Sequence, residues 1–167
     1  MPTERALPPL PEGAFAGLAA FTDALRLALD HAAHHAWPEL IWSDSDFEDW
    51  PLGDSAVEAS LQQWAKRGQR LTLLATGFEP LQRRQHRFVR FRRQWSHLVE
   101  CRVASRQAAT RLPSAWWSAG WVLQRHDPLR SLGTCSAAAA QRVLLREQLD
   151  GVLAQSRPGF PASTLGL

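Results

Sequence analysis

PSAWWSAGWVLQRHDPLRSLGTC, residues 113–135, is the stretch that decides the predicted fold. The run Trp121-Val122-Leu123 favours a β-strand, and His126-Asp127-Pro128 is typical of a turn. The stretch therefore predicts two short strands joined by a turn, with the second strand over residues 129–132. If the chain has an active site, we expect it to lie here.

Helical and extended patterns alternate along the chain on both sides of this strand pair. Apolar residues at spacings of three and four predict a long helix that begins at Ala14 and stops at Trp37-Pro38. Asp54 is the predicted cap of a second helix, and Gly68 ends that helix. Pro80 opens a third helix, strands are expected over residues 40–42, 70–76 and 98–103, and the last helix is expected over 137–155.

Strands that alternate with helices of ten or more residues are typical of parallel βαβ units, and the terminal strand pair adds an antiparallel part. We therefore expect a mixed α/β fold whose sheet is mainly parallel, with helices on both faces. Residues 1–13 are rich in proline and lack periodicity, which predicts a disordered lead-in. Residues 14–167 are expected to form one domain, whose uncharged tail, 158–167, docks on the body or covers a partner.

Composition limits the possible partners and the compartment. The chain has a formal net charge of +3, and Lys66 is its only lysine, so the charge alone is weak evidence for a nucleic-acid partner. The two cysteines, Cys101 and Cys135, have no metal-ligand neighbours in the sequence and are expected to be buried thiols. No stretch resembles a transmembrane span or a secretory leader, so we expect a cytoplasmic protein that does not contact membranes.

The order of the expected elements over residues 14–156 resembles one half of a phospholipase D superfamily domain. The signature of that family is His-x-Lys-x4-Asp on the first strand of the terminal pair, followed after the turn by Gly-Ser or Gly-Thr. Asp127 falls at the position of the aspartate, and Gly133-Thr134 falls at the position of the later pair. Counted back from Asp127, the histidine position is Gly120 and the lysine position is Val122.

In that family the histidine attacks phosphorus and the lysine neutralises the phosphate, which neither glycine nor valine can do. The resemblance therefore implies a non-catalytic, phospholipase D-like binding or interaction module that needs no cofactor. The superfamily's habit of pairing two halves, together with the apolar tail, implies a homodimer. The segments WVLQR at 121–125 and PGFPASTLGL at 158–167 also resemble a small family of uncharacterised bacterial domains found alone or behind an acetyltransferase domain, which suggests an acetyltransferase partner.

An acidic stretch at residues 43–51 follows the first expected strand, at the end of the sheet where α/β proteins usually bind ligands. Asp44 and Asp46 could hold Mg²⁺ there for metal-dependent phosphotransfer. Acidic residues before a helix are also ordinary caps and solvated turn residues. We favour that structural interpretation, because the Asp-x-Asp is not followed by the Gly-Thr or Gly-Val of haloacid-dehalogenase-like enzymes.

Six arginines lie within residues 83–93, on the third expected helix. Arg83, Arg87 and Arg90 follow the side opposite to the apolar Phe88 and Phe91, so they could bind nucleic acid or another anionic ligand. The favoured alternative is a solvated basic face that is partly paired with acidic neighbours.

Three histidines, His31, His34 and His35, end the first expected helix at a spacing that could bind a transition metal. Nothing nearby in the sequence completes a ligand shell, and histidines are favourable at a helix C-terminus. The sequence therefore favours a structural role for them.

Overall fold

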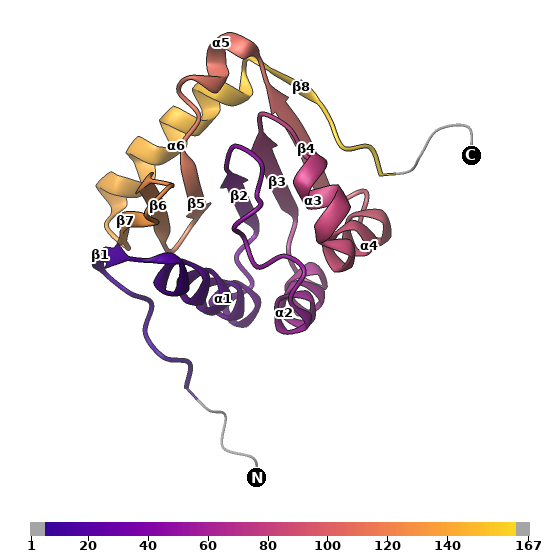
Figure 1. Cartoon of the computed structure of the whole chain (residues 1–167). Helices are drawn as coiled ribbons and strands as arrows, with labels where there is room; N and C mark the ends of the chain where they lie inside the picture. The colour runs from indigo at the N-terminus through magenta and orange to yellow at the C-terminus, as the bar shows by residue number, and fades with distance from the viewer. Residues whose placement is uncertain (1–5, 163–167) are drawn as a thin grey trace.

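Three parallel strands form the centre of the sheet, and antiparallel strands extend it on both sides. The structure, a computed structural model, describes residues 6–162. Within that range one sheet has the strand order β1-β7-β6-β5-β2-β3-β4-β8 (Figure 1). The strands are β1 Gly13–Ala16, β2 Glu39–Ser43, β3 Arg70–Ala75, β4 Val99–Ala104, β5 Ser114–Ser118, β6 Val122–Asp127, β7 Leu132–Ser136 and β8 Ser156–Pro158.

The mixed α/β class is confirmed, but the expectation of a mainly parallel sheet is wrong. In the described part of the chain, the β2–β3 and β3–β4 pairs are parallel and the other five pairs of neighbours are antiparallel. The expected strand pair within residues 113–135 is in fact three strands, β5, β6 and β7. Short turns join these strands, and so short a connection can join only antiparallel neighbours.

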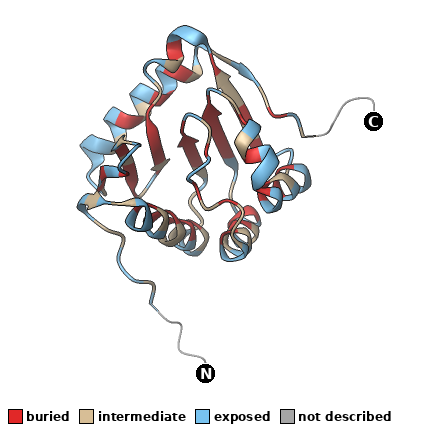
Figure 2. Ribbon diagram, viewed as in Figure 1, coloured by how far each residue is buried: buried red, intermediate tan, exposed pale blue. Residues whose placement is uncertain are grey.

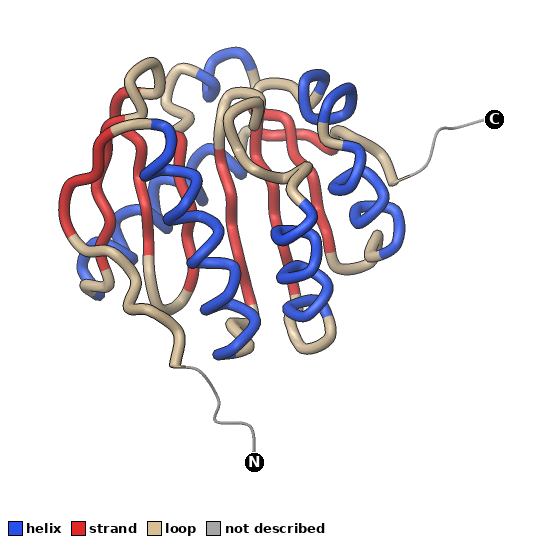
Figure 3. The backbone as a smooth tube through the Cα atoms, turned by 60° about the horizontal axis from the view of Figure 1, so that its bottom comes forward, coloured by secondary structure: helices blue, strands red, loops and turns tan. Residues whose placement is uncertain are grey.

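Helices cover both faces of the sheet, as the sequence predicted (Figures 1 and 3). One face carries α1 Leu18–His35, α2 Ser55–Ala65, α3 Glu79–Arg84 and α4 His86–Gln94, and the other carries α5 Arg106–Ala109 and α6 Ala139–Leu153. No helix among residues 6–162 combines the length and the apolar composition that crossing a bilayer requires.

The central strands contribute to two cores, because alternate side chains of a strand point to opposite faces of the sheet. Leu40 and Trp42 of β2 pack on the side of α1–α4, whereas Ile41 packs on the side of α6. The first core is aromatic: the ring centre of Trp42 lies 5.5 Å from that of Trp116 and 5.6 Å from that of Trp50. Figure 2 shows the buried strands between helices whose outer sides are exposed.

The expected third helix is broken into α3 and α4 at Gln85. This residue has φ −118° and ψ 64°, and its side chain points into the protein. Its Nε2 donates to the Phe47 carbonyl at 2.8 Å, and its Oε1 accepts from the Gly53 backbone N–H at 2.9 Å. A buried glutamine thus holds the loop after β2, and one continuous helix could not place it there.

The segment before β1 contacts the body of the protein. The Pro8 carbonyl lies 2.7 Å from His31 Nε2, and the Pro11 carbonyl accepts a hydrogen bond of 3.0 Å from Trp121 Nε1. The expected disordered lead-in therefore does not describe residues 8–13, because side chains of the body bind the free carbonyls of this proline-rich segment. Gly13 itself belongs to β1 and pairs with Cys135 of β7.

The chain after α6 also docks on the body. β8 pairs with β4, the Gly159 N–H donates to the Cys101 carbonyl at 3.0 Å, and Phe160 is buried. Docking is thus the outcome for residues 158–160 of the expected tail, and its last part, 163–167, lies outside the described residues.

The cap predicted at Asp54 is present, and it yields a stability prediction. Asp54 Oδ1 accepts from the Ala56 backbone N–H at 2.9 Å, and Arg26 Nε donates to Oδ2 at 3.0 Å. The hydrogen bond from Ala56, helped by Arg26, holds the pKa of the Asp54 carboxyl below its ordinary value of 3.8. Asp54→Ala should lower the free energy of unfolding at neutral pH by about 1 kcal/mol, the usual effect of removing an N-cap.

The charge-dependent part of this stabilisation has a defined pH range. Because the folded pKa is depressed, the contribution is present above pH 3.8 and is lost as the pH falls through the folded pKa. Urea unfolding from neutral to acidic pH measures it, with Asp54→Asn as the control that keeps the capping oxygen. An Ala variant as stable as the wild type at neutral pH would contradict the cap.

Candidate functional site

The acidic residue nearest the carboxyl end of β2 is buried and fully engaged by protein groups. Asp44 Oδ1 accepts from Arg125 Nη2 at 3.0 Å and from Ser114 Oγ at 2.7 Å. Its Oδ2 accepts from the Phe47 backbone N–H at 2.8 Å. The carboxylate therefore connects the loop after β2 to β5 and β6 through these hydrogen bonds.

Arg125 of β6 is the counter-charge of this carboxylate and is itself only 4% exposed. Its Nη1 pairs with Asp49 at 2.9 Å and donates to Ser131 Oγ at 3.2 Å, and its Nε donates to Ser114 Oγ at 3.1 Å. The guanidinium carbon lies 4.3 Å from the ring centre of Phe21 on α1. A buried charge needs this many partners, because leaving it unpaired costs several kcal/mol.

Asp44 and Asp46, the candidate metal ligands, do not point at a common position. Asp44 faces Arg125 in the interior, whereas Asp46 Oδ1 accepts from the Glu48 backbone N–H at 3.0 Å, as in an ordinary turn. Among residues 6–162, no three His, Cys, Asp or Glu side chains gather closely enough to hold a metal ion. Asp46 has the turn role that the sequence favoured, whereas Asp44 is the buried partner of Arg125, a role that the sequence did not indicate.

The histidine cluster lies at the end of α1. The ring centres of His34 and His35 are 4.9 Å apart, those of His31 and His35 are 5.5 Å apart, and the His35 ring stacks on Trp37 at 5.9 Å. Partial burial, with the nearby charges of His34 and His31, lowers the pKa of His35. These rings form a contacting aromatic group at the helix end, in which only His35 and Trp37 are stacked.

The positions assigned through the phospholipase D resemblance do not form a site. Gly120 is not on a strand but in the bend between β5 and β6, where a Cβ atom would lie 2.5 Å from a ring carbon of Trp37. Val122 begins β6 and is buried on the α6 side of the sheet. Asp127 Oδ1 accepts from the Arg130 backbone N–H at 3.2 Å and so stabilises the turn before β7. Of the two positions that correspond to the histidine and the lysine, only that of Val122 therefore lies on a strand.

The predicted basic residues lie on the exposed side of α3 and α4. Arg83 is 3.9 Å from Glu79, and Arg84 pairs with Glu48. Arg87 and Arg90 both approach one carboxylate, that of Glu58 on α2, at 3.5 and 3.7 Å. Among residues 6–162, Arg93 has no acidic side chain within ion-pair distance. We call Arg83, Arg84, Arg87, Arg90 and Arg93 the α3–α4 arginine surface.

Arg92, in the same cluster, points the other way and is buried. Its guanidinium donates to the carbonyls of Val99 at 2.8 Å and Phe160 at 3.3 Å. These hydrogen bonds connect α4 to β4 and to the chain after β8. Sequence reasoning missed this role. The only signal was its spacing, since Arg92 directly follows Phe91 and lies four residues after Phe88 on the apolar side.

Comparisons with known proteins identify a shared fold. No family model and no curated protein matches the chain. Among solved structures, the chain is similar to TrmBL2, an archaeal chromatin protein whose structure shows a novel mode of DNA binding. The match has 14% identity and a TM-score of 0.66, and it covers 94% of this chain and 56% of that one. This chain thus spans little more than half of TrmBL2, and the likeness establishes the fold alone.

The phospholipase D resemblance stays a prediction.

The buried ion pair yields a sharp stability prediction. Asp44→Asn removes the buried one of the two carboxylates that pair with Arg125 and should lower the free energy of unfolding by about 3 kcal/mol, as expected when one partner of a buried pair is lost. Asp46→Asn is the matched control and should change it by less than about 1 kcal/mol, because Asp46 is partly exposed. Guanidinium unfolding measures both, and equal effects would refute a structural role specific to Asp44.

Proposed function

We propose that this chain is a nucleic-acid-binding domain that contacts the phosphate backbone through the α3–α4 arginine surface. The observation that carries the proposal is the excess of exposed cationic side chains there. Five arginines face three acidic partners, Glu48, Glu58 and Glu79. Side-chain exposure is 78% for Arg83 and 68% for Arg90, so a polyanion can reach these guanidinium groups.

The existing ion pairs do not prevent this binding. Arg87 and Arg90 share a single carboxylate at distances longer than a good hydrogen bond, and exposed pairs of this kind contribute at most about 1 kcal/mol each. A phosphate can bind a guanidinium with two parallel hydrogen bonds, which is a stronger arrangement. Phosphate groups therefore compete well for Arg90, and for the N–H groups of Arg87 other than the one that Nη1 donates to the Gly53 carbonyl at 2.8 Å.

The fold comparison is consistent with this proposal. TrmBL2 binds DNA, and this chain corresponds to 56% of it at 14% identity, so the comparison supplies a fold precedent and does not locate a surface. The surface is argued from the arginines alone. A homodimer and an acetyltransferase partner stay predictions.

The proposal predicts salt-dependent binding to a generic duplex, measured by fluorescence anisotropy. Affinity falls with salt, and for each phosphate contact that is lost the slope of log affinity against log salt should become less negative by about 0.9. Arg87→Gln combined with Arg90→Gln should therefore weaken binding and make the slope less negative by about 1.8. The control, Arg106→Gln combined with Arg111→Gln, removes the same charge from exposed arginines outside the surface and should keep the wild-type slope. Salt-independent affinity, or equal losses in both double variants, would refute the proposal.

A further inference from the structure

β1 is the border strand at one end of the sheet, and its outer edge is open (Figure 1). In its antiparallel pair with β7, the Gly17 N–H donates to the Ser131 carbonyl at 3.0 Å, so the backbone groups of Phe15 also face β7. Because these groups alternate along a strand, the N–H and C=O groups of Ala14 and Ala16 point away from the sheet. Both alanines are exposed, and no strand within residues 6–162 pairs with this side of β1.

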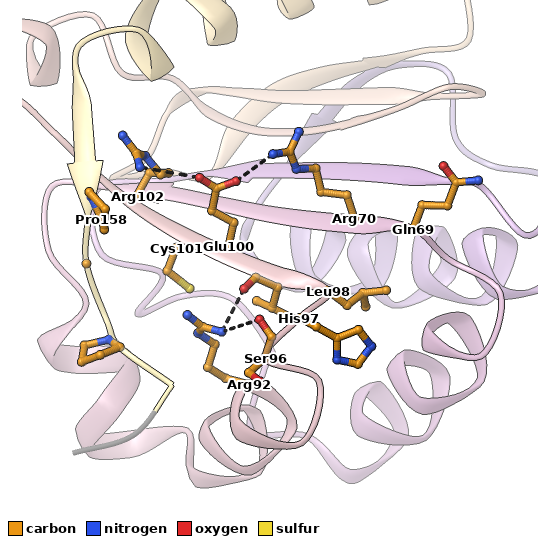
Figure 4. Close-up of a pocket in the computed structure, with 13 residues that line it drawn as sticks. Gln69, Arg70, Arg92, Ser96, His97, Leu98, Glu100, Cys101, Arg102 and Pro158 are labelled. Carbon is orange, nitrogen blue, oxygen red and sulfur yellow. Dashed lines mark hydrogen bonds and ion pairs between the residues drawn. The ribbon is translucent and has the colours of Figure 1, made fainter. Parts of the chain in front are cut away.

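The opposite border of the sheet is protected against the addition of a strand. β8 has three residues, and two of them are Arg157, which carries a charge, and Pro158, which has no N–H to donate. Beyond β8, residues 98–101 of β4 border a groove of about 760 Å³ (Figure 4). The outward carbonyls of Val99 and Cys101 there already accept hydrogen bonds of 2.8 and 3.0 Å.

β1 has none of these protections. Its sequence, Gly-Ala-Phe-Ala, contains no charged residue and no proline, and its register with β7 has no bulge. Of the five exposed large apolar side chains within residues 6–162, Leu18 follows β1, Leu132 lies opposite Ala16 on β7, and Leu129 is in the turn before β7. An unprotected strand edge beside exposed apolar side chains is typical of a surface that another strand covers.

The outward groups of β1 match those of a second, antiparallel β1. When Ala14 of one copy faces Ala16 of the other, each outward N–H meets a carbonyl, about a two-fold axis at Phe15. A shifted register leaves some of these groups unpaired. The Phe15 ring stacks on Phe21 at 6.2 Å, so the axis also brings two partly buried aromatic rings together as a cross-strand pair.

The charges at the two ends of β1 also suit this arrangement. Glu12 directly precedes β1, is exposed, and has no ion pair among residues 6–162. Arg130 lies at the other end, in the turn before β7; its side chain is 79% exposed, and its one ion pair in the described chain is a distant one, 4.0 Å to Asp127. The two-fold axis places the Glu12 end of each copy beside the Arg130 end of the other.

We propose that two copies of this chain associate through β1, so that the sheet continues across a two-fold axis. An identical strand supplies the matching hydrogen-bond pattern and the complementary charge, and the inference rests on this edge and not on the phospholipase D resemblance. The contact is small, so the dimer dissociates at micromolar concentrations. It leaves the α3–α4 arginine surface free, because Arg92 binds α4 to β4 at the other end of the sheet, and it does not depend on nucleic-acid binding.

Sedimentation equilibrium of the intact chain across micromolar concentrations tests the association, which should be reversible. Ala16→Pro removes an outward N–H from each copy and keeps the ladder with β7, so it should weaken the dimer about tenfold or more. Ala14→Lys should also weaken it, because it brings like charges together at the edge. Ala59→Lys adds the same charge on the exposed side of α2 and should dimerise as the wild type does. A monomer at every concentration, or edge variants that dimerise like the control, would overturn the proposal.

Cysteine cross-linking tests the register without a proline. An Ala14→Cys chain mixed with an Ala16→Cys chain should form a disulfide on oxidation, because facing residues of such a pair lie roughly 5.5 Å apart between Cα atoms. Each chain alone should cross-link far less. The native Cys101 and Cys135 do not compete, because burial raises the pKa of both thiols to about 12. Equal cross-linking in the mixture and in the separate chains would refute the two-fold pairing.

Discussion

The salt bridge between Arg125 and Asp44 is the constraint on which the carboxyl edge of the sheet depends. Its two residues are 81 positions apart, and both are buried. A guanidinium in such a place is tolerated only when every side of it is paired. Asp44 also holds Phe47 at φ 62°, a left-handed conformation that a bulky residue adopts only when its surroundings enforce it. The Phe47 carbonyl in turn binds the Gln85 side chain that separates α3 from α4.

This chain of contacts links the buried charge to the surface. The loop that Asp44 and Arg125 fix carries Glu48, and Gln85 sets the direction in which α4 leaves α3. The acidic groups nearest the ends of the central strands are therefore used for structure. The cationic groups left for binding lie elsewhere, on α3 and α4. Function on this scaffold thus depends on arginines at its periphery.

Local patterns in the sequence predicted most of the regular structure and little of the long-range pairing. The helical spacing of Phe21 and Leu25, the cap at Asp54 and the runs that became β2, β3 and β4 are local signals, and each produced an element near its expected place. β1 and β8 are short and exist only because distant strands pair with them, so no local pattern marks them. The break at Gln85 and the inward turn of Arg92 depend on tertiary hydrogen bonds, which override a continuous helical pattern.

The candidate sites show the same division. The exposed arginines were identified from spacing alone, because a charged side of an amphipathic helix is a local feature. The role of Asp44 could not be deduced, because its partner comes from a strand far along the chain. The groove beside the edge of β4 is lined by residues of β3, β4, β8 and the loop after α4, so it is a property of the assembled sheet.

The most direct test of nucleic-acid binding by the α3–α4 arginine surface is arginine footprinting of the intact chain. Phenylglyoxal modification, with and without duplex DNA, is read for each arginine by peptide mass spectrometry. The account predicts that duplex protects Arg83, Arg87, Arg90 and Arg93 and leaves Arg106 and Arg111 as reactive as before. Protection of Arg106 and Arg111 instead, or a bound duplex that leaves all four of the former arginines reactive, would contradict it.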